Sequence, residues 1–531
     1  MNLASWLHQT GLVRPDAPAI RAGEHLHATY GDFARRACAL GRHLQSAHGI
    51  GRGDRVALFA KNCAEYLEVV YGVLWIGATI VPINNKLHPR EAAWIIENAE
   101  AKLAITETGE ICDREDEAGA ACPEVGIRSA PLASAIAGAA LADYGPPVAV
   151  EDDDIAWLFY TSGTTGRPKG VMTTHRNLRM MATSYALDVD TVSAEDHSLY
   201  AAPMSHGAGL YNFQFVRAGG CHVIPDSKGF DPAEIQHLAE RLGNLVFFAA
   251  PTMITRLMRH AETTGYDGTG IRTISYGGGP MYLADITRAL EVFGPKFVQI
   301  YGQGESPMTI TAMPRDLVAD RTHPRADARR ASVGIAQSCV EVRVVDDAMQ
   351  DMPEGETGEV VVRGDTVMKG YWNNDKATAE TVIDGWLRTG DLGRLDGDGF
   401  LTLTDRSKDV IISGGTNIYP REVEEALLTH DGVFEVSVIG CPPPRVGRGG
   451  RGLRRTGRGR RLRRGRAGEL VPVADRLVQE AEAIRLRARA AQEQLRQGSK
   501  DQPARTRRPL GGGGVNVPAR ANAEKGGYHA A

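Results

Sequence analysis

Up to residue 441, short apolar runs alternate along the chain with segments whose apolar residues recur at helical spacing. The run RVALF at residues 55–59 has the length of a strand, and the spacing over residues 63–76 predicts a helix directly after it. Further strands are expected at residues 77–83, 103–106, 246–250, 273–276 and 297–301, and a further helix at residues 90–99. This alternation predicts an α/β protein with largely parallel sheets.

Toward residue 404 the pattern favours strands over helices. EVVVR at residues 359–363 and the run at residues 399–404 predict a smaller β-rich part. Residues 405–413 then link to a compact unit that is expected to begin with a helix at residues 420–429. The sequence has no internal repeat, and its low-complexity stretch is an Arg/Gly block at residues 445–466.

The composition is that of an ordinary globular protein. Apolar residues make up 42% and charged residues 24% of the 531 residues, and that length predicts about two to four domains. No apolar run approaches the ~20 residues of a membrane-spanning helix, and the first residues do not resemble a secretory signal. The seven cysteines include no CxxC pair, so we expect neither a zinc site nor a disulfide framework, and a cytoplasmic location.

The net charge of −4 combines two regions of opposite sign. Residues 445–531 contain 22 Lys and Arg against 7 Asp and Glu, a net charge of +15. The rest of the chain carries 39 against 58, a net charge of −19. An Arg/Gly block ordinarily suggests nucleic-acid binding, so this sharp boundary requires an explanation.

The strongest chemical signal is YTSGTTGRPKG at residues 160–170. Glycines let backbone N–H groups turn toward one point, Ser and Thr hydroxyls add donors, and Lys169 adds a positive charge. This combination suits a polyphosphate. The alternative is a flexible polar loop between a strand and a helix. The spacing differs from GxxxxGK[ST], which disfavours a kinase or a GTPase.

The whole run resembles the phosphate loop of adenylate-forming enzymes, the superfamily of acyl-CoA synthetases, peptide-synthetase adenylation domains and firefly luciferase. Further motifs resemble those of the family and follow in its order: PMSHGAGL at 203–210, YGGGP at 276–280, YGQGE at 301–305, GETGEVVVRG at 355–364, GYW at 370–372, WLRTGDLG at 386–393 and DRSKDVIISGGTNIYPREVE at 405–424. The resemblance covers residues 1–441. It implies an α/β fold with a large N-terminal AMP-binding domain, made of parallel-rich sheets with helices and a β-rich subdomain, over residues 1–404.

The resemblance also implies a hinge and the start of a small α+β lid domain over residues 405–441. The lid is truncated or scrambled here, because residues 442–531 form an aberrant Arg/Gly-rich tail that we expect to be disordered.

The family's reaction has two steps. A carboxylate attacks the α-phosphate of ATP to give an acyl-adenylate and pyrophosphate, and a thiol, normally that of coenzyme A, then takes the acyl group. Because two anions meet in the first step, the site needs positive charge more than acid–base groups. ATP, Mg²⁺ and coenzyme A are therefore implied. The expected partners are a small carboxylic acid, ATP and coenzyme A, for a monomer or homodimer without a nucleic-acid partner.

The family's residue roles carry over where the motifs match. The phosphate loop comprises Thr161, Ser162, Gly163, Thr164, Thr165, Gly166 and Lys169. Glu305 would hold Mg²⁺, and Asp391 would accept hydrogen bonds from both ribose hydroxyls. The backbone of Gly278, Gly279 and Pro280 would lie close to the adenine, with Tyr301 stacked on it, and Gly302, Gln303 and Gly304 would also bind the nucleotide. Arg406 would reach the ribose or the phosphates. Outside these motifs, Glu305 would be interpreted as a solvated carboxylate and Tyr301 as a core residue.

Other positions concern the acid and the hinge. His206 stands where the family often has a histidine or an aromatic residue at the mouth of the acid pocket; a histidine satisfied by its neighbours is the alternative. Gly304 replaces the commoner Thr and so removes a hydroxyl near the α-phosphate. Lys408 matches the hinge of the small domain. Gly414 and Gly415 match the loop that lines the pantetheine tunnel, or else form an ordinary turn.

The run MSHGAGLYNF predicts the class of acid. It has no aspartate to bind an α-amino group, so an amino acid is not expected. No carrier-domain serine motif follows, which favours free coenzyme A as the acceptor. Between Met204 and Phe215 the ionisable side chains are His206 and Tyr211, so the far end of the acid is expected to be apolar. Fatty acids and aryl or cinnamoyl-type acids both fit.

The resemblance ends after VIGCP at residues 438–442, although the family's C-terminal domain continues to a lysine that neutralises the attacking carboxylate. Shifting the codons by one base lets residues 444–453 decode as PEWGEEVVAF and residues 478–504 as FKRPKRYAFVRALPKNNYGKVLKTSLR, which both resemble the family's continuation. A net gain of one nucleotide within the codons of residues 442–444 would produce this pattern. We therefore hypothesise a frameshift that places Gln497 where the lysine belongs.

Three functions stay open at this point. The first is an ATP-dependent carboxylic acid:CoA ligase. The second is a catalytically impaired remnant that binds ATP or acyl-adenylate, because the C-terminal lysine is missing from this tail. The third is an Arg-rich nucleic-acid-binding protein, whose affinity would fall steeply with salt. We rank them in this order, and we expect the chain with this tail to be impaired in adenylation.

Overall fold

The computed structural model describes residues 1–109, 111, 122–137, 145–161 and 167–406, together with four short strands beyond them. The chain divides into two units, Met1–Thr404 and Asp405–Ala531. In the second unit, β22 (Ile411–Ser413) pairs with β23 (Thr416–Ile418), and β24 (Ile439–Cys441) pairs with β25 (Gly514–Asn516), both antiparallel. The helix expected at residues 420–429 lies outside the described residues.

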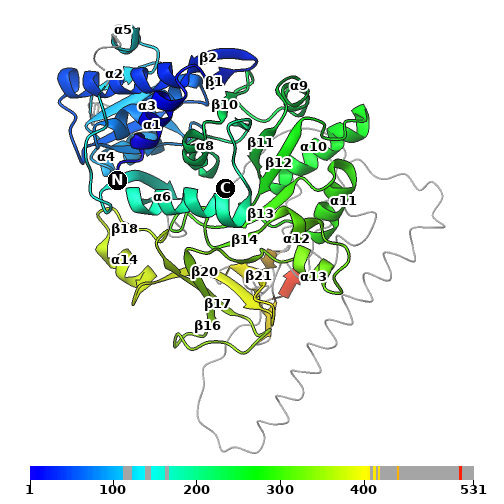
Figure 1. Ribbon diagram of the computed structural model, residues 1–531. Coiled ribbons are helices and arrows are strands. Elements are labelled where there is room, and N and C mark those ends of the chain that lie inside the picture. The colour runs from blue at the N-terminus through cyan, green and yellow to red at the C-terminus, as the bar shows by residue number, and fades with distance from the viewer. Residues whose placement is uncertain are drawn as a thin grey trace, which may run out of the picture. The chain divides into compact units, whose positions relative to one another are not determined.

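A seven-stranded sheet contains the first half of the predicted strands (Figure 1). Its order is β18 (Gly370–Tyr371), β8 (Lys169–Thr174), β7 (Ile155–Thr161), β4 (Thr79–Pro82), β3 (Arg55–Phe59), β5 (Leu103–Thr106) and β6 (Glu124–Gly126). The strands from β7 to β6 run parallel, whereas β8 and β18 are antiparallel to their neighbours. The strands predicted at 55–59 and 103–106 are confirmed with their bounds, and the one predicted at 77–83 is shorter.

A nine-stranded sheet holds the second half. Its order is β15 (Ile335–Ala336), β14 (Thr311–Met313), β13 (Phe297–Tyr301), β12 (Ile271–Tyr276), β11 (Leu245–Ala249), β9 (His197–Leu199), β10 (Cys221–Ile224), β1 (Pro18–Ala22) and β2 (His25–Thr29). The six strands from β13 to β1 run parallel. The carboxyl ends of parallel strands meet at one edge of the sheet, which is where open α/β sheets bind ligands.

The predicted β-rich part is a five-stranded antiparallel sheet. It comprises β16 (Val340–Val345), β17 (Gly358–Gly364), β20 (Trp386–Leu395), β19 (Val382–Ile383) and β21 (Leu401–Arg406), which pairs with β20. The expected α/β architecture with parallel-rich sheets and a β-rich part is therefore confirmed.

Helices connect and cover these sheets (Figure 1). They are α1 (Ala4–Val13), α2 (Tyr30–His48), α3 (Ala64–Trp75), α4 (Pro89–Asn98), α5 (Ala130–Ala137), α6 (His175–Ser184), the π-helix η2 (Tyr185–Val189), α7 (Gly207–Leu210), α8 (Asn212–Ala218), α9 (Pro232–Leu242), α10 (Pro251–Thr264), α11 (Leu283–Phe293), α12 (Arg315–Ala319), α13 (Ala326–Arg330) and α14 (Asp375–Thr381). Among the described residues, no helix has the length and apolar character to cross a membrane.

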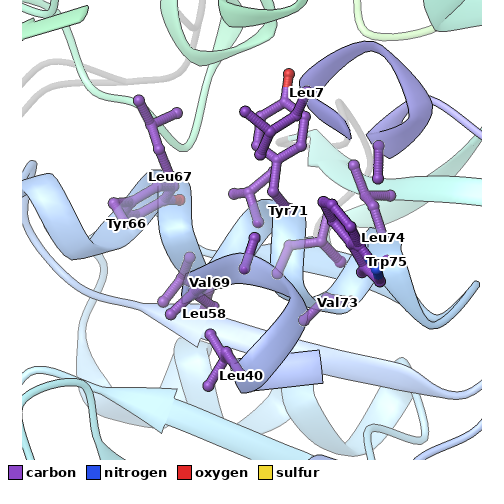
Figure 2. Close-up of a cluster of buried hydrophobic side chains, with 14 of the residues drawn as sticks. Leu7, Leu40, Leu58, Tyr66, Leu67, Val69, Tyr71, Val73, Leu74 and Trp75 are labelled. Atoms are coloured by element: carbon purple, nitrogen blue, oxygen red, sulfur yellow. The ribbon is translucent and has the colours of Figure 1, made fainter. Parts of the chain in front are cut away.

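The core of the first unit surrounds α3, the helix predicted at residues 63–76. All of its residues except Glu65 are buried, as expected of a helix that is apolar on every side. Figure 2 shows Leu7 of α1, Leu40 of α2 and Leu58 of β3 gathered around it. A Cβ on Gly72 would lie 2.9 Å from Leu40 Cδ2, so a glycine here lets α2 and α3 approach closely.

Candidate active site

The phosphate-loop motif spans a β-hairpin. Strands β7 and β8 are antiparallel, and the last pair of their register joins Thr161 to Lys169. The two ends of the predicted loop are therefore held opposite each other. Ser162, Gly163, Thr164, Thr165 and Gly166 lie outside the described residues. The Lys169 ammonium lies 4.8 Å from the centroid of the Tyr371 ring, a cation–π contact that places its charge beside β18.

Tyr371 also contacts the predicted metal ligand. Its hydroxyl donates a hydrogen bond of 2.8 Å to Oε1 of Glu305. Burial and the neighbouring Glu305 carboxylate raise the pKa of Tyr371, so the phenol keeps the proton that it donates. Tyr371 thus orients both Lys169 and Glu305, although the sequence analysis gave it no role. The signal was available in the GYW motif at residues 370–372.

A second polar cluster joins the nine-stranded and five-stranded sheets. The hydroxyl of Tyr301, at the end of β13, donates a 2.6 Å hydrogen bond to Oδ2 of Asp391 on β20. The Gln303 amide donates a 2.6 Å bond to the same oxygen and a 3.0 Å bond to the Thr389 carbonyl. Asp391 is only 7% exposed, and two donors on one carboxylate oxygen fix its orientation.

The glycine-rich segments bring the backbone of neighbouring strands together. Gly278, Gly279 and Pro280 follow β12 and are exposed, and Gly278 has a left-handed φ of +74°, which glycine adopts without strain. A Cβ on Gly302 would lie 2.6 Å from the Met308 amide nitrogen. A Cβ on Gly304 would lie 2.5 Å from Thr161 Cγ2 and 2.9 Å from Phe159 Cδ1.

The contacts of Gly304 leave little room for the commoner Thr. The loop after β13 packs directly on β7, so a branched side chain has no room without a shift of Thr161 or Phe159. The sequence analysis treated Gly304 as a lost hydroxyl. The structure adds that glycine here allows the close approach of the YGQGE segment to the hairpin.

His206 lies immediately before α7. Its Nδ1 is 3.0 Å from the hydroxyl of Ser205, and its ring meets Phe159 edge-on at a centroid distance of 5.5 Å. Burial, with a smaller contribution from Lys86, lowers the pKa of His206, which favours a neutral imidazole. Phe159, which contacts both His206 and the Gly304 position, is a second residue that the sequence analysis did not identify.

A small cavity lies next to these loops, between the nine-stranded sheet and the helices that cover it. Its volume is about 10 Å³. The lining residues are Tyr185, Ser198, Leu199, Ala208, Tyr211, Phe215, Val246, Phe247, Phe248 and Ser275. A Cβ on Gly278 would lie 3.5 Å from Phe248 Cζ. The cavity therefore adjoins the YGGGP segment and contains Ala208 of the PMSHGAGL motif.

Several predicted residues cannot be placed. Lys408, Gly414, Gly415 and Gln497 lie outside the described residues, as does the side chain of Arg406. Within the described part of the chain, no group of three His, Cys, Asp or Glu side chains could hold a metal ion. Glu305 could still bind Mg²⁺, since this ion is commonly held by one or two carboxylates together with substrate phosphates and water.

The hairpin, the Lys169–Tyr371–Glu305 group and the Tyr301–Asp391–Gln303 group define the class of an adenylate-forming enzyme. The model of the family described as "AMP-binding enzyme" matches residues 7–372, and the chain belongs to this family. It is an acid–thiol ligase of the acyl-CoA synthetase type, and members of this class use ATP and coenzyme A.

Individual relatives agree with this assignment. The chain is similar to a feruloyl-CoA synthase from Amycolatopsis sp, at 36% identity over 85% of this chain and 88% of that protein. A long-chain-fatty-acid–CoA ligase of Mycobacterium tuberculosis H37Rv is 32% identical over 84% of this chain and 87% of its own length. The o-succinylbenzoate CoA synthetase of Bacillus subtilis, in complex with its acyl-adenylate intermediate, matches at a TM-score of 0.71 and 30% identity, covering 83% of this chain and 86% of that chain.

Proposed function

We propose that the protein activates a fatty or an aryl/cinnamoyl-type acid as its adenylate and transfers the acyl group to coenzyme A. Two contact groups carry this proposal: Tyr371 contacts both Lys169 and Glu305, and Tyr301 and Gln303 both donate to Asp391. Relatives named for ferulate and for long-chain fatty acids support both acid types.

The nucleotide would lie across these groups. Asp391, oriented by Tyr301 and Gln303, accepts hydrogen bonds from the ribose hydroxyls. The exposed backbone of Gly278, Gly279 and Pro280 lies along the adenine, with Tyr301, Gly302 and Gly304 beside the nucleotide and Arg406 toward its ribose or phosphates. The loop from Thr161 to Lys169, including Ser162, Gly163, Thr164, Thr165 and Gly166, surrounds the β- and γ-phosphates. Glu305 would hold Mg²⁺, which supplies charge neutralisation to the phosphate oxygens.

In the first step, an oxygen of the carboxylate forms a bond to the α-phosphorus while the bond from that phosphorus to the bridging oxygen breaks. Pyrophosphate leaves with the electron pair of that bond. The chain's contribution is electrostatic: Lys169 places positive charge where anions meet, on a rigid strand that needs no reorganisation. His206, at the mouth of the acid pocket, orients the carboxylate.

In the second step, the coenzyme A thiol attacks the acyl carbon, loses its proton to solvent and displaces AMP. Lys408 would act as the hinge of the small domain between the two steps. Gly414 and Gly415 would line the pantetheine tunnel.

The test is coenzyme A-dependent release of AMP across a panel of fatty and aromatic acids, with one version of the chain restored to the alternative frame from residue 444 onward. We expect release with at least one acid and loss of that release when either coenzyme A or the acid is omitted. The absence of AMP release with every acid, even in the restored chain, would refute the ligase function.

A second candidate applies to the chain with its present tail. Gln497 stands where the shifted frame places a lysine, and an amide cannot neutralise the attacking carboxylate. This chain would then bind ATP or acyl-adenylate but release pyrophosphate slowly. Single-turnover pyrophosphate release should rise when the frame is restored, and a Lys→Ala change at position 497 of the restored chain should abolish the gain.

A further inference from the structure

The cavity beside the YGGGP segment has an aromatic wall with one unusual member. Tyr185 and Tyr211 meet at a centroid distance of 4.8 Å in a T-shaped arrangement, and Tyr211 faces Phe248 at 6.5 Å. Phe215 completes the wall. Such a lining favours contact with an aromatic ring at the edge of the cavity, because aromatic rings gain from edge-to-face and offset contacts beyond the area they bury.

The hydroxyl of Tyr211 has no hydrogen-bond partner among the described residues, although the side chain is only 5% exposed and the oxygen is closed off from solvent. The buried hydroxyl of Tyr71, in contrast, donates to Asn212 at 2.8 Å. A buried hydroxyl without a partner is unfavourable, and Tyr211 lines a cavity in which a ligand group can supply the missing partner.

Two further hydroxyls of the cavity wall are only loosely bonded. Tyr185 and Ser275 lie 3.3 Å apart, longer than the usual distance between two hydroxyl oxygens. The cavity volume of about 10 Å³ is close to what about one water-sized group requires. Burial, together with neighbouring Tyr185, raises the pKa of Tyr211, so its phenol stays neutral and can both donate and accept.

The cavity is continuous with the elements that would hold the acid. Ala208 belongs to the PMSHGAGL motif, and Tyr211 follows its last residue. On the other side, Phe248 lies against Gly278. A group in the cavity would therefore lie between the segment that follows the PMSHGAGL motif and Phe248, which adjoins the YGGGP segment.

We propose that Tyr211 is a specificity-determining residue whose hydroxyl binds a hydroxyl group at the far end of an aryl acid. This inference rests on the proposed ligase function and selects, within it, hydroxylated aryl acids over fatty acids and unsubstituted aryl acids. The sequence analysis expected an apolar far end, and the unpartnered oxygen of Tyr211 changes that expectation. An acid without the hydroxyl leaves Tyr211 unsatisfied, whereas the hydroxyl of a hydroxylated ring forms one hydrogen bond with it, as donor or as acceptor.

The test uses non-hydrolysable acyl-sulfamoyl adenosines, which mimic the acyl-adenylate and need no turnover. Calorimetric titration of the full chain compares the 4-hydroxycinnamoyl, 2-hydroxycinnamoyl and cinnamoyl analogues. We expect the 4-hydroxy analogue to bind about tenfold more tightly than the other two, the effect of one well-satisfied buried hydrogen bond. Tyr211→Phe should reduce that ratio to about one by weakening the 4-hydroxy analogue.

Tyr276→Phe is the matched control. Its hydroxyl is also buried without a partner, but it does not line the cavity, so this variant should keep the tenfold ratio. Equal binding of the three analogues, or a ratio that survives in Tyr211→Phe, would overturn the proposal while leaving the ligase function intact. If none of the analogues binds although ATP does, the inference fails, and AMP release with the panel of fatty and aromatic acids decides the ligase function separately.

Discussion

The nucleotide side and the acid side of the site differ in whether their buried polar groups already have hydrogen-bond partners. On the nucleotide side, Asp391 already accepts two hydrogen bonds and Glu305 one, from residues far away in the sequence. On the acid side, the Tyr211 hydroxyl has no partner among the described residues. Hydrogen bonds that are already formed before the ligand binds suit a ligand that is the same in every turnover, since they hold the site in its binding geometry. An unpaired polar group instead obtains its hydrogen bond only from a ligand with a matching group, which favours discrimination between acids with and without that group.

The largest expected effect comes from removing the charge of Glu305. In the chain restored to frame, Glu305→Gln should slow single-turnover pyrophosphate release by about 10²–10³-fold, because one preorganised electrostatic contact is lost at the phosphates. The amide oxygen still accepts from Tyr371, so the fold is kept. Binding of an acyl-sulfamoyl adenosine, which lacks the pyrophosphate, should hardly change. Glu341→Gln, at an exposed carboxylate on β16, is the control, and an equal loss there would contradict the role of Glu305.

Asp391→Asn should have the next largest effect. Hydrogen bonds to a charged group contribute about 1.5–3 kcal/mol, so ATP binding should weaken about 10–100-fold in calorimetry. The matched ligand is 2′,3′-dideoxy-ATP, which has no ribose hydroxyls to donate. Wild type and variant should bind this analogue with similar Kd. A variant that loses affinity for both nucleotides equally would show that Asp391 acts only through the packing of β20.

The sequence predicted the fold well where local patterns decide it. The runs at residues 55–59, 103–106 and 297–301 became β3, β5 and β13 with the same bounds. In contrast, the start of β12 was missed because Ile271 and Arg272 precede the apolar run, and its pairing with β11 extends the strand. Short edge strands such as β18 depend on pairing with β8, and no periodicity in two residues can reveal that.

The sequence predicted the residues of the site only where they belong to recognisable motifs. Lys169, Glu305 and Asp391 were identified from matching segments, but their mutual contacts required the structure, since they are far apart in the sequence. Tyr371 and Phe159 were missed because an aromatic residue in a strand is ordinarily a core residue. The close contact of Gly304 was not predicted, because the distance to Thr161 depends on how two sheets meet.

That close approach yields a stability prediction. Gly304→Thr should lower the free energy of unfolding by about 1–3 kcal/mol, since its Cβ would lie 2.5 Å from Thr161 Cγ2 and overpacking forces neighbours to shift. Urea denaturation at constant m-value measures the change. Gly229→Thr is the control, because the nearest atom to its Cβ is 3.9 Å away. If Gly304→Thr is as stable as wild type, the loop after β13 does not pack on β7 as described.

The smallest expected effect compares two Tyr→Phe variants, one on each side of the site. Tyr301→Phe removes a donor to the buried Asp391 carboxylate and should lower the free energy of unfolding by about 1.5 kcal/mol. Tyr211→Phe removes a buried hydroxyl that has no partner among the described residues, so its stability without ligand should be unchanged or slightly raised. Both substitutions delete the same atom, which cancels the intrinsic difference between tyrosine and phenylalanine. Equal destabilisation in urea would mean that the Tyr211 hydroxyl is already satisfied, for instance by a buried water molecule, and that the two sides do not differ.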